Sequence, residues 1–283
     1  MSALLKKLIV TADDFGLCRE VNEAVAAAHT RGVLTAASLM VRGDAVEDAV
    51  AVAKANPRLG VGLHLVLVQG RSVLPKSRIP DIVDEEGNFA DAVAASGVRY
   101  FFSPAARRQV AEECEAQVRR FLDLGLKIDH IDGHTHLHIH PTILEIVIGL
   151  ARKYRIPAVR LPRQPIRSLS ARQAPMAMVM APWVARTRAR LRAAGLFHND
   201  AVFGLFETGR LDREAWRKIL AELEPGVNEV YGHPATHTRG VLLEQMPGYH
   251  HAEELAALQD PELRRRIADS GIVLGSFSAF SSA

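Results

Sequence analysis

The chain has 283 residues, 48% of them hydrophobic and 24% charged, and a formal net charge of +3. This composition is ordinary for a soluble globular protein, and no stretch approaches the length of a membrane span. The two cysteines, Cys18 and Cys114, exclude a disulfide framework, and the apolar run before Asp13 is too short for a signal peptide. We therefore expect a cytoplasmic protein.

The positive charge is concentrated in one segment. No acidic residue occurs between Glu145 and Asp200, whereas eleven arginine and lysine residues do. The rest of the chain holds 24 basic and 32 acidic residues. A local basic block indicates an anionic partner such as a lipid surface or a phosphate. The block contains no motif that reads nucleic acid, so we do not expect a nucleic-acid partner.

Apolar runs typical of strands alternate with amphipathic segments typical of helices. Strands are predicted over 4–11, 33–41, 59–68, 128–133 and 158–161, near Val202, before His233 and over 272–277. Helices are predicted over 19–30, 44–55 and 104–124, from 141 onward, and over 212–223, 252–258 and 261–270. This alternation predicts parallel βαβ units, about seven in number, in an α/β fold of the distorted or incomplete (β/α) TIM-like barrel type.

Two stretches interrupt the alternation. Residues 69–103 contain prolines and glycines without a clear period, and we expect a long loop there that forms a lid or a substrate wall. Residues from about 162 to 200 form a basic, partly apolar insertion. No internal repeat or low-complexity linker divides the chain, so we expect residues 1–283 to form a single domain.

Histidine is concentrated in one stretch, His130–Pro141, which reads H-I-D-G-H-T-H-L-H-I-H-P and holds five of the twelve histidines. The stretch begins on a predicted strand that ends at Gly133. It continues into a loop, because Pro141 fits the first turn of a following helix. Imidazoles beside the carboxylate of Asp132 are typical of a metal site, and an accidental histidine tract is the alternative.

Active sites of parallel α/β proteins lie at the carboxyl ends of the strands. Three sets of polar side chains are predicted there: Asp13 with Asp14, His64, and His134. Two imidazoles and one carboxylate make an open site for one divalent cation, Zn²⁺ or a partly hydrated Mg²⁺, and the second aspartate is then a candidate base. Taken singly, the aspartates also fit a helix-capping turn, and His64 also fits a core position.

Other polar residues are candidates for supporting roles. His233, at another predicted strand end, is a candidate acid for a leaving group, and its alternative role is to end the strand before Pro234. Arg160 is expected either to hold Asp13 ionised and oriented or to be a surface charge. The residues expected to orient ligands or to touch substrate are Asp132, His136 and His138.

Four motifs resemble those of the YdjC-like carbohydrate deacetylases, and the similarity spans nearly the whole chain. They are A-D-D-F-G at 12–16, G-L-H-L at 62–65, D-G-H-T-H-L-H at 132–138 and E-V-Y-G-H-P at 229–234. The resemblance implies a metal-dependent hydrolase that removes the acetyl group from an N-acetylated sugar and has a distorted barrel fold. Position by position, it implies the metal ligands Asp14, His64 and His134, the catalytic base Asp13 and, by a looser match, the acid His233.

Within that family, residues 191–200, 202–205 and 233–236 resemble the HpnK-type deacetylases of hopanoid biosynthesis. The implied substrate is an N-acetylglucosaminyl hopanoid. Cys18 departs from the family pattern, which often has a small hydroxyl residue there, but it lies outside the implied ligand set. Two other hypotheses stay open: deacetylation of soluble chito-oligosaccharides, and a non-catalytic metal-binding membrane adaptor.

The basic insertion offers a route to such a lipid. Ala174–Trp183 is mostly apolar, and four arginines follow at 186–192. Apolar residues with tryptophan beside clustered arginine suit a segment that lies on an anionic membrane, and a buried helix with solvated arginines is the alternative. Residues from about 174 to 192 are therefore the candidate for peripheral contact with the inner membrane. The sequence is also compatible with a homodimer.

Overall fold

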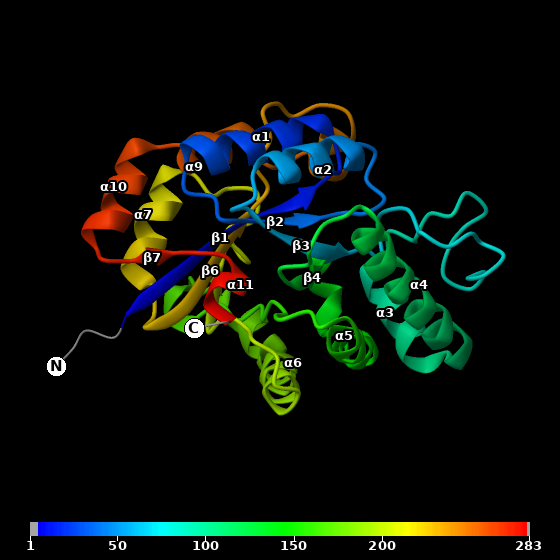
Figure 1. Cartoon of the computed structure of the whole chain (residues 1–283). Helices are drawn as coiled ribbons and strands as arrows, with labels where there is room; N and C mark the ends of the chain where they lie inside the picture. Colours follow the sequence, from blue (N-terminus) through cyan, green and yellow to red (C-terminus); the bar gives the residue numbers. More distant parts are fainter. Residues whose placement is uncertain (1–4, 282–283) are drawn as a thin grey trace.

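A curled sheet of seven parallel strands forms the centre of the molecule, and helices pack around it (Figure 1). The computed structural model describes residues 5–281. The strand order is β4-β3-β2-β1-β6-β5, and β7 pairs with the start of β1. The strands are β1 (Lys6–Phe15), β2 (Ala36–Leu39), β3 (Gly60–Leu65), β4 (Ile131–Gly133), β5 (Ala201–Phe203), β6 (Gly226–Gly232) and β7 (Val273–Leu274).

Helices cover both faces of the sheet, with α1, α2 and α9 on one side and α5 and α6 on the other (Figure 1). The 3₁₀ helix η1 (His134–Ile139) follows β4, and a second 3₁₀ helix, η2 (Ile166–Ser168), precedes α6. The α-helices are α1 (Arg19–Arg31), α2 (Val46–Ala55), α3 (Val93–Phe102), α4 (Pro104–Asp123), α5 (Pro141–Tyr154), α6 (Ala174–Ala193), α7 (Arg213–Glu222), α8 (Val241–Gln245), α9 (His251–Leu258), α10 (Pro261–Asp269) and α11 (Phe277–Ser281).

Local sequence explains the main elements. β1 is buried from Leu8 to its end, as expected for the central strand of a parallel sheet that is covered on both faces. α4 begins where the Ser103 hydroxyl accepts a hydrogen bond from the main chain of Ala106, and Pro104 occupies the first turn, where its missing N–H costs nothing. These signals fix the order of strands and helices, and hence which side chains reach the strand ends.

A segment without regular strand structure connects the two ends of the strand order. Ile131 of β4 pairs with Val159 through a single parallel bridge, and Ala158 pairs in the same way with Phe197. Farther along, the main-chain N–H of Val202 in β5 donates to the carbonyl of Arg163. Residues 158–163 therefore lie between β4 and β5, and they carry Arg160 into the interior.

The predicted α/β fold of parallel βαβ units is confirmed, and the seven strands agree with the expected number of units. In place of the expected TIM-like barrel, the parallel sheet is curled into about half of one. The strand expected over 158–161 is reduced to single bridges. The strand expected from Leu4 begins at Lys6, and Leu4 lies outside the described residues. The stretch 69–103, expected to be a loop, contains α3 over its last part.

The basic insertion forms the helix α6, which lies at the outer edge of the molecule (Figure 1). Among its residues only Thr187 and Leu191 are buried, so the alternative of a buried helix is wrong. Met176, Met178 and Trp183 are exposed on it. Within residues 5–281, no helix combines the length and the apolar character needed to cross a bilayer.

Candidate functional site

The first part of the site is a bulge near the end of β1. β1 pairs with β2 at Ala12 and again at Phe15, but it has one more residue than β2 between these two positions. Asp14 adopts a left-handed backbone with φ of 61°. Neighbouring side chains on a regular strand point to opposite faces, whereas the bulge lets both Asp13 and Asp14 line one cavity of about 320 Å³.

Two imidazoles face Asp14 in this cavity. Nε2 of His64 lies 3.4 Å from Asp14 Oδ1, and Nδ1 of His134 lies 3.3 Å from the same oxygen. One ligand atom from each of the three residues lies within 4.8 Å of the others. β1, β3 and the start of η1 thus bring together three residues that are far apart in the sequence.

The Asp14 carboxylate fits a bound cation. Both of its oxygens are buried, and neither has a hydrogen-bond partner among the described residues. Burial opposes ionisation, but the imidazoles of His134 and His64 outweigh it, so the pKa of Asp14 lies well below its usual range. A buried carboxylate without hydrogen bonds is costly unless a positive charge compensates it. With two imidazole nitrogens beside it, the donor set suits Zn²⁺ or another divalent ion.

The orientation of His64 is fixed by Asp132. His64 Nδ1 lies 2.9 Å from Asp132 Oδ1, so this nitrogen donates to the carboxylate whether the ring is neutral or charged, and Nε2 faces Asp14. Asp132 also accepts a hydrogen bond from Ser38 Oγ at 2.7 Å and forms an ion pair with Arg160 Nη1 at 2.6 Å. Burial disfavours the imidazolium, but the carboxylates of Asp132 and Asp14 outweigh it and raise the pKa of His64 to about 10.

A chain of buried polar contacts extends from Asp132 to the C-terminal segment. Nε2 of His130 lies 3.2 Å from Ser38 Oγ, and its Nδ1 lies 3.0 Å from Asp129 Oδ2. The His130 ring stacks on Phe277 with 4.3 Å between ring centroids. Asp129 in turn accepts hydrogen bonds from Ser276 Oγ at 2.8 Å and from the main chain of residues 277 and 278. His64 is thus supported by a polar network rather than by packing alone.

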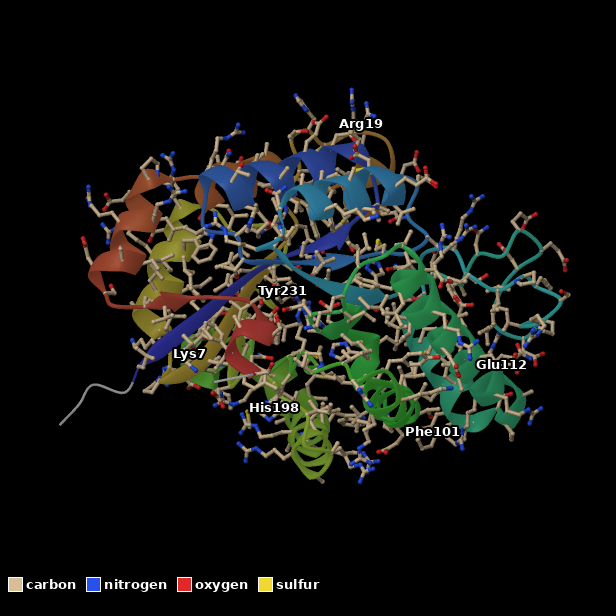
Figure 2. The ribbon with its side chains drawn as sticks, viewed as in Figure 1. Lys7, Arg19, Phe101, Glu112, His198 and Tyr231 are labelled. Atoms are coloured by element: carbon tan, nitrogen blue, oxygen red, sulfur yellow. The ribbon has the colours of Figure 1, made fainter. Side chains whose placement is uncertain are left out.

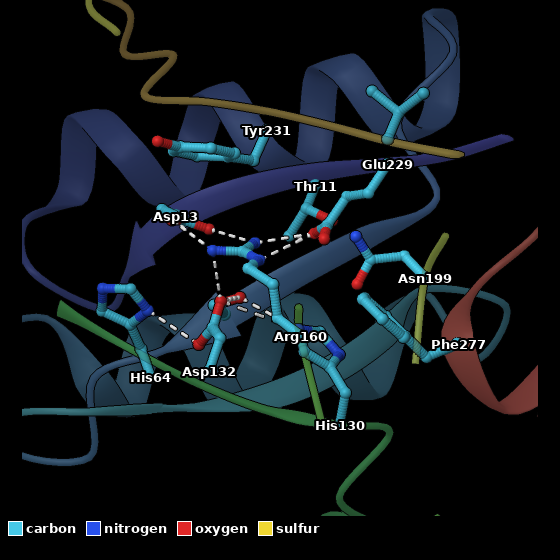
Figure 3. Close-up of polar contacts among 12 residues, drawn as sticks. Thr11, Asp13, His64, His130, Asp132, Arg160, Asn199, Glu229, Tyr231 and Phe277 are labelled. Atoms are coloured by element: carbon cyan, nitrogen blue, oxygen red, sulfur yellow. Dashed lines mark hydrogen bonds and ion pairs between the residues drawn. The ribbon is translucent and has the colours of Figure 1, made fainter. Parts of the chain in front are cut away.

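Arg160 is the centre of the buried polar cluster (Figure 3). Its side chain has no exposed surface, and its guanidinium binds Asp13 through two hydrogen bonds of 2.7 and 2.8 Å. The same guanidinium pairs with Asp132 at 2.6 Å and with Glu229 at 2.8 Å, and it lies 4.8 Å from the centroid of the Tyr231 ring. The alternative of a surface charge at Arg160 is therefore wrong.

The other histidines of His130–Pro141 occupy different places. Thr135 and His136 adopt left-handed backbone conformations with φ of 55° and 56°, which turn the chain away from β4 after Gly133. His136 lines the cavity, and its Nε2 lies 2.9 Å from Tyr231 Oη. His138 is buried outside the cavity lining, with Nε2 3.0 Å from the carbonyl of Arg160. His138 therefore supports the main chain that carries Arg160.

His233 reaches the cavity from the end of β6. Its Nε2 lies 4.0 Å from Asp14 Oδ2, and its ring lies between the rings of Tyr231 and Tyr249, at centroid distances of 5.9 and 5.2 Å. Its main-chain N–H donates to Glu254 Oε2 at 2.6 Å. The structure thus places His233 in the same cavity as the Asp14 cluster.

The sequence interpretation missed Glu229 and Tyr231 as site residues, and a period of two counted back from His233 could have found both. Glu229, Tyr231 and His233 alternate along β6 and its end, and they share the face that turns toward Arg160 and the cavity. Tyr231 lies in the middle of the molecule among converging side chains, whereas Arg19 and Glu112 lie at its periphery (Figure 2).

A parallel α/β protein with carboxylates and imidazoles gathered at its strand ends carries these groups where enzymes of this architecture place their active sites. The chain belongs to the YdjC-like family, because the family model described as YdjC-like protein matches residues 7–269. The family resemblance predicted from the motifs is confirmed.

Relatives of this chain include carbohydrate deacetylases. The one from Brevibacillus brevis is 34% identical over 273 residues, which cover 96% of this chain and 98% of the relative. The one from Geobacillus stearothermophilus is 32% identical, and the match covers 96% of this chain and 97% of the relative. Among solved structures, a protein from Enterococcus faecalis described as a cellobiose-phosphate cleavage protein is 26% identical, with a TM-score of 0.77 and coverage of 98% of this chain and 99% of that one.

The role of Arg160 can be tested by stability. Arg160→Met leaves three buried carboxylates without their shared cation, and we expect the free energy of unfolding to fall by about 3–5 kcal/mol in urea titrations. Arg167→Met is the matched control, because exposed Arg167 pairs with Glu222 and Glu224 at the surface and should cost less than about 1 kcal/mol. Equal losses in the two variants would contradict the central role of Arg160.

Proposed function

We propose that this protein is a metal-dependent carbohydrate N-deacetylase that hydrolyses the acetamide of an N-acetylated sugar. The observation that carries the proposal is the buried Asp14 carboxylate, which has no hydrogen-bond partner within residues 5–281 and faces His64 and His134. A second carboxylate, that of Asp13, lies beside it and is held in place by Arg160. The deacetylase relatives, which match over nearly their whole length, support the same reaction.

Asp14, His64 and His134 would hold the cation. When bound, the cation supplies Lewis acidity toward the acetamide carbonyl and toward water. The donor set favours Zn²⁺ or another transition metal, with a hydrated Mg²⁺ as the second candidate. Asp132 accepts the Nδ1 proton of His64, so Nε2, on the side of Asp14, is the nitrogen that would bind the ion.

The chain's own residues then divide the proton transfers. Asp13 is the base that accepts the proton of the attacking water, and the two hydrogen bonds from Arg160 hold its carboxylate in one orientation. His233 is the acid that gives a proton to the departing amine. The products are acetate and the free amino sugar. Burial, together with the nearby Asp13 carboxylate, raises the pKa of Tyr231 well above its usual range, so its hydroxyl stays neutral beside His136.

For the substrate we propose an N-acetylglucosaminyl hopanoid. Support comes from the segments 191–200, 202–205 and 233–236, which resemble the HpnK-type enzymes, and from the exposed apolar side chains of α6. Arg186 and Arg190 on the same helix suit contact with an anionic membrane, although Glu145 already pairs with both. The lipid would then be reached at the membrane surface.

A second candidate substrate is a soluble chito-oligosaccharide. A polar cleft of about 510 Å³ adjoins the catalytic cavity, because Gln69 and Gln245 line both. Arg42, Asp84 and Asn88 are among its lining side chains, and such groups suit the hydroxyls of further sugar units.

Acetate release and metal content together test the proposed roles. We expect Asp13→Asn to lower kcat by about 10²–10⁴-fold while it retains the metal, because only the base is lost. We expect His134→Ala to lose both metal and activity, because a ligand is removed. Metal content is measured by elemental analysis, and His237→Ala, at an exposed position outside the cavity lining, is the control. A wild-type protein that binds metal but releases no acetate from any N-acetylated sugar would instead be an adaptor.

Metal uptake should depend on pH. In the metal-free protein the pKa of His64 is raised from 6.5 to about 10, so the imidazolium predominates at pH 8. A cation needs the Nε2 lone pair, so binding displaces about one proton from His64, and affinity should rise roughly tenfold per pH unit from pH 7 to 9. Asp14 is already ionised over that range and releases none. Calorimetry in two buffers with different ionisation heats counts the proton, and an affinity that is flat from pH 7 to 9 would refute this prediction.

Substrate class can be settled by direct competition. We expect kcat/KM for an N-acetylglucosaminyl hopanoid in anionic vesicles to exceed that for N,N′-diacetylchitobiose by about tenfold or more, because a lipid adds apolar contacts that the disaccharide cannot make. The readout is free amine formed from each substrate. A preference for the disaccharide would assign the enzyme to soluble chito-oligosaccharides.

A further inference from the structure

An apolar groove lies beside the catalytic cavity. It has a volume of about 420 Å³ and runs between residues 162–167, α6 and residues 205–206. Most of its lining side chains are apolar, and they include Ile166, Met180, Val184 and Phe206. A groove of this size and character suits a hydrocarbon rather than a sugar.

The groove and the catalytic cavity share a wall. Leu205 lines both spaces, so a ligand that crosses this residue can occupy the two at once. The wall is held in place by Gln164, whose Oε1 accepts hydrogen bonds from the main chain of Leu205 at 3.1 Å and of Phe206 at 3.4 Å. Gln164 Nε2 also donates to Glu207 at 3.0 Å. The partition is therefore a built feature of the fold.

The rim of the groove carries an incompletely satisfied guanidinium. Arg163 and Arg167 both bind Glu224, at 2.8 and 2.9 Å. Arg188 also lines the groove, but its buried Nε has no hydrogen-bond partner among the described residues. Its Nη2 donates only a long bond, 3.3 Å, to the carbonyl of Asp200. A ligand oxygen at this rim, such as a hydroxyl at the polar end of an amphiphile, would accept a hydrogen bond from Arg188 Nε.

The apolar character continues from the groove onto the surface. Ile166 and Met180 line the groove and are also exposed to solvent, at 57 and 39%. Apolar side chains exposed at the mouth of a groove are typical of a site that takes its ligand from a lipid phase.

We propose that this groove binds the apolar aglycone of an amphiphilic substrate while its N-acetylated sugar occupies the catalytic cavity. The inference rests on the proposed deacetylase function for the sugar, but it concerns a separate set of residues. The class of substrate is an N-acetylglucosamine linked to an extended hydrocarbon, with a polar linkage near Arg188.

Binding of paired glycosides tests the groove without requiring turnover. Dodecyl and methyl N-acetyl-β-D-glucosaminide share the sugar and differ only in the chain, and calorimetry below the critical micelle concentration gives both affinities. We expect the wild-type protein to bind the dodecyl glycoside at least about tenfold more tightly. Ala185→Trp fills the groove from α6, and this preference should disappear. Ala189→Trp, one turn farther along α6 and outside the groove, should retain it.

The outcomes separate the groove from the reaction. Equal binding of the two glycosides by the wild-type protein, or a chain preference that survives in Ala185→Trp, would overturn the inference. A preference that is lost equally in Ala185→Trp and Ala189→Trp would assign the chain to the outer face of α6 instead. If the dodecyl chain binds in the groove but no acetate is released from either glycoside, the inference about the groove is supported and the proposed deacetylase function is wrong. Thermal denaturation of both variants shows whether they are folded.

Discussion

The enclosure of one guanidinium by three carboxylates is the interaction on which the rest of the site depends. Arg160 lies beneath the cavity and contacts Asp13, Asp132 and Glu229, which come from three different strands. Removing these charges from water is costly, and the mutual contacts offset that cost only while all partners are present. Asp14 adds a fourth carboxylate above them, so negative charge exceeds positive charge at this end of the sheet. A divalent cation is the simplest way to reduce that imbalance.

The geometry around this cluster depends on backbone that ordinary residues seldom adopt. Asp14, Thr135 and His136 all have left-handed conformations although none is glycine. Such conformations cost about 1–3 kcal/mol each and persist where the surroundings impose them. Here they aim two neighbouring aspartates into one cavity and end the strand that precedes His134. The unfavourable backbone conformations thus lie at the positions where the direction of the side chain matters for chemistry.

Much of this arrangement could be predicted from the sequence because strand ends in a parallel sheet converge. The convergence of Asp14, His64 and His134 needs only the alternation of strands and helices and three polar strand ends. The burial of Arg160 could not be predicted in the same way, because the strand predicted over 158–161 is reduced to isolated bridges and its pattern does not show which way the Arg160 side chain points. Glu229 was not predicted as a site residue, because a single acidic residue in an apolar strand does not indicate a site until its buried partner is known.

Sequence separation within the sheet has a consequence for how the protein folds. β1 is the central strand, yet its long partner β6 lies about 220 residues away, as the pairing of Lys6 with Gly226 shows. Asp129, at the far end of the polar network behind His64, is likewise held by residues 276–278. During synthesis β1 can pair early with β2, but its other edge stays open until β6 has been made, and contacts of such long range make folding slow. Until then this open edge can pair with a strand of another chain, which is the exposure that favours aggregation of partly folded chains.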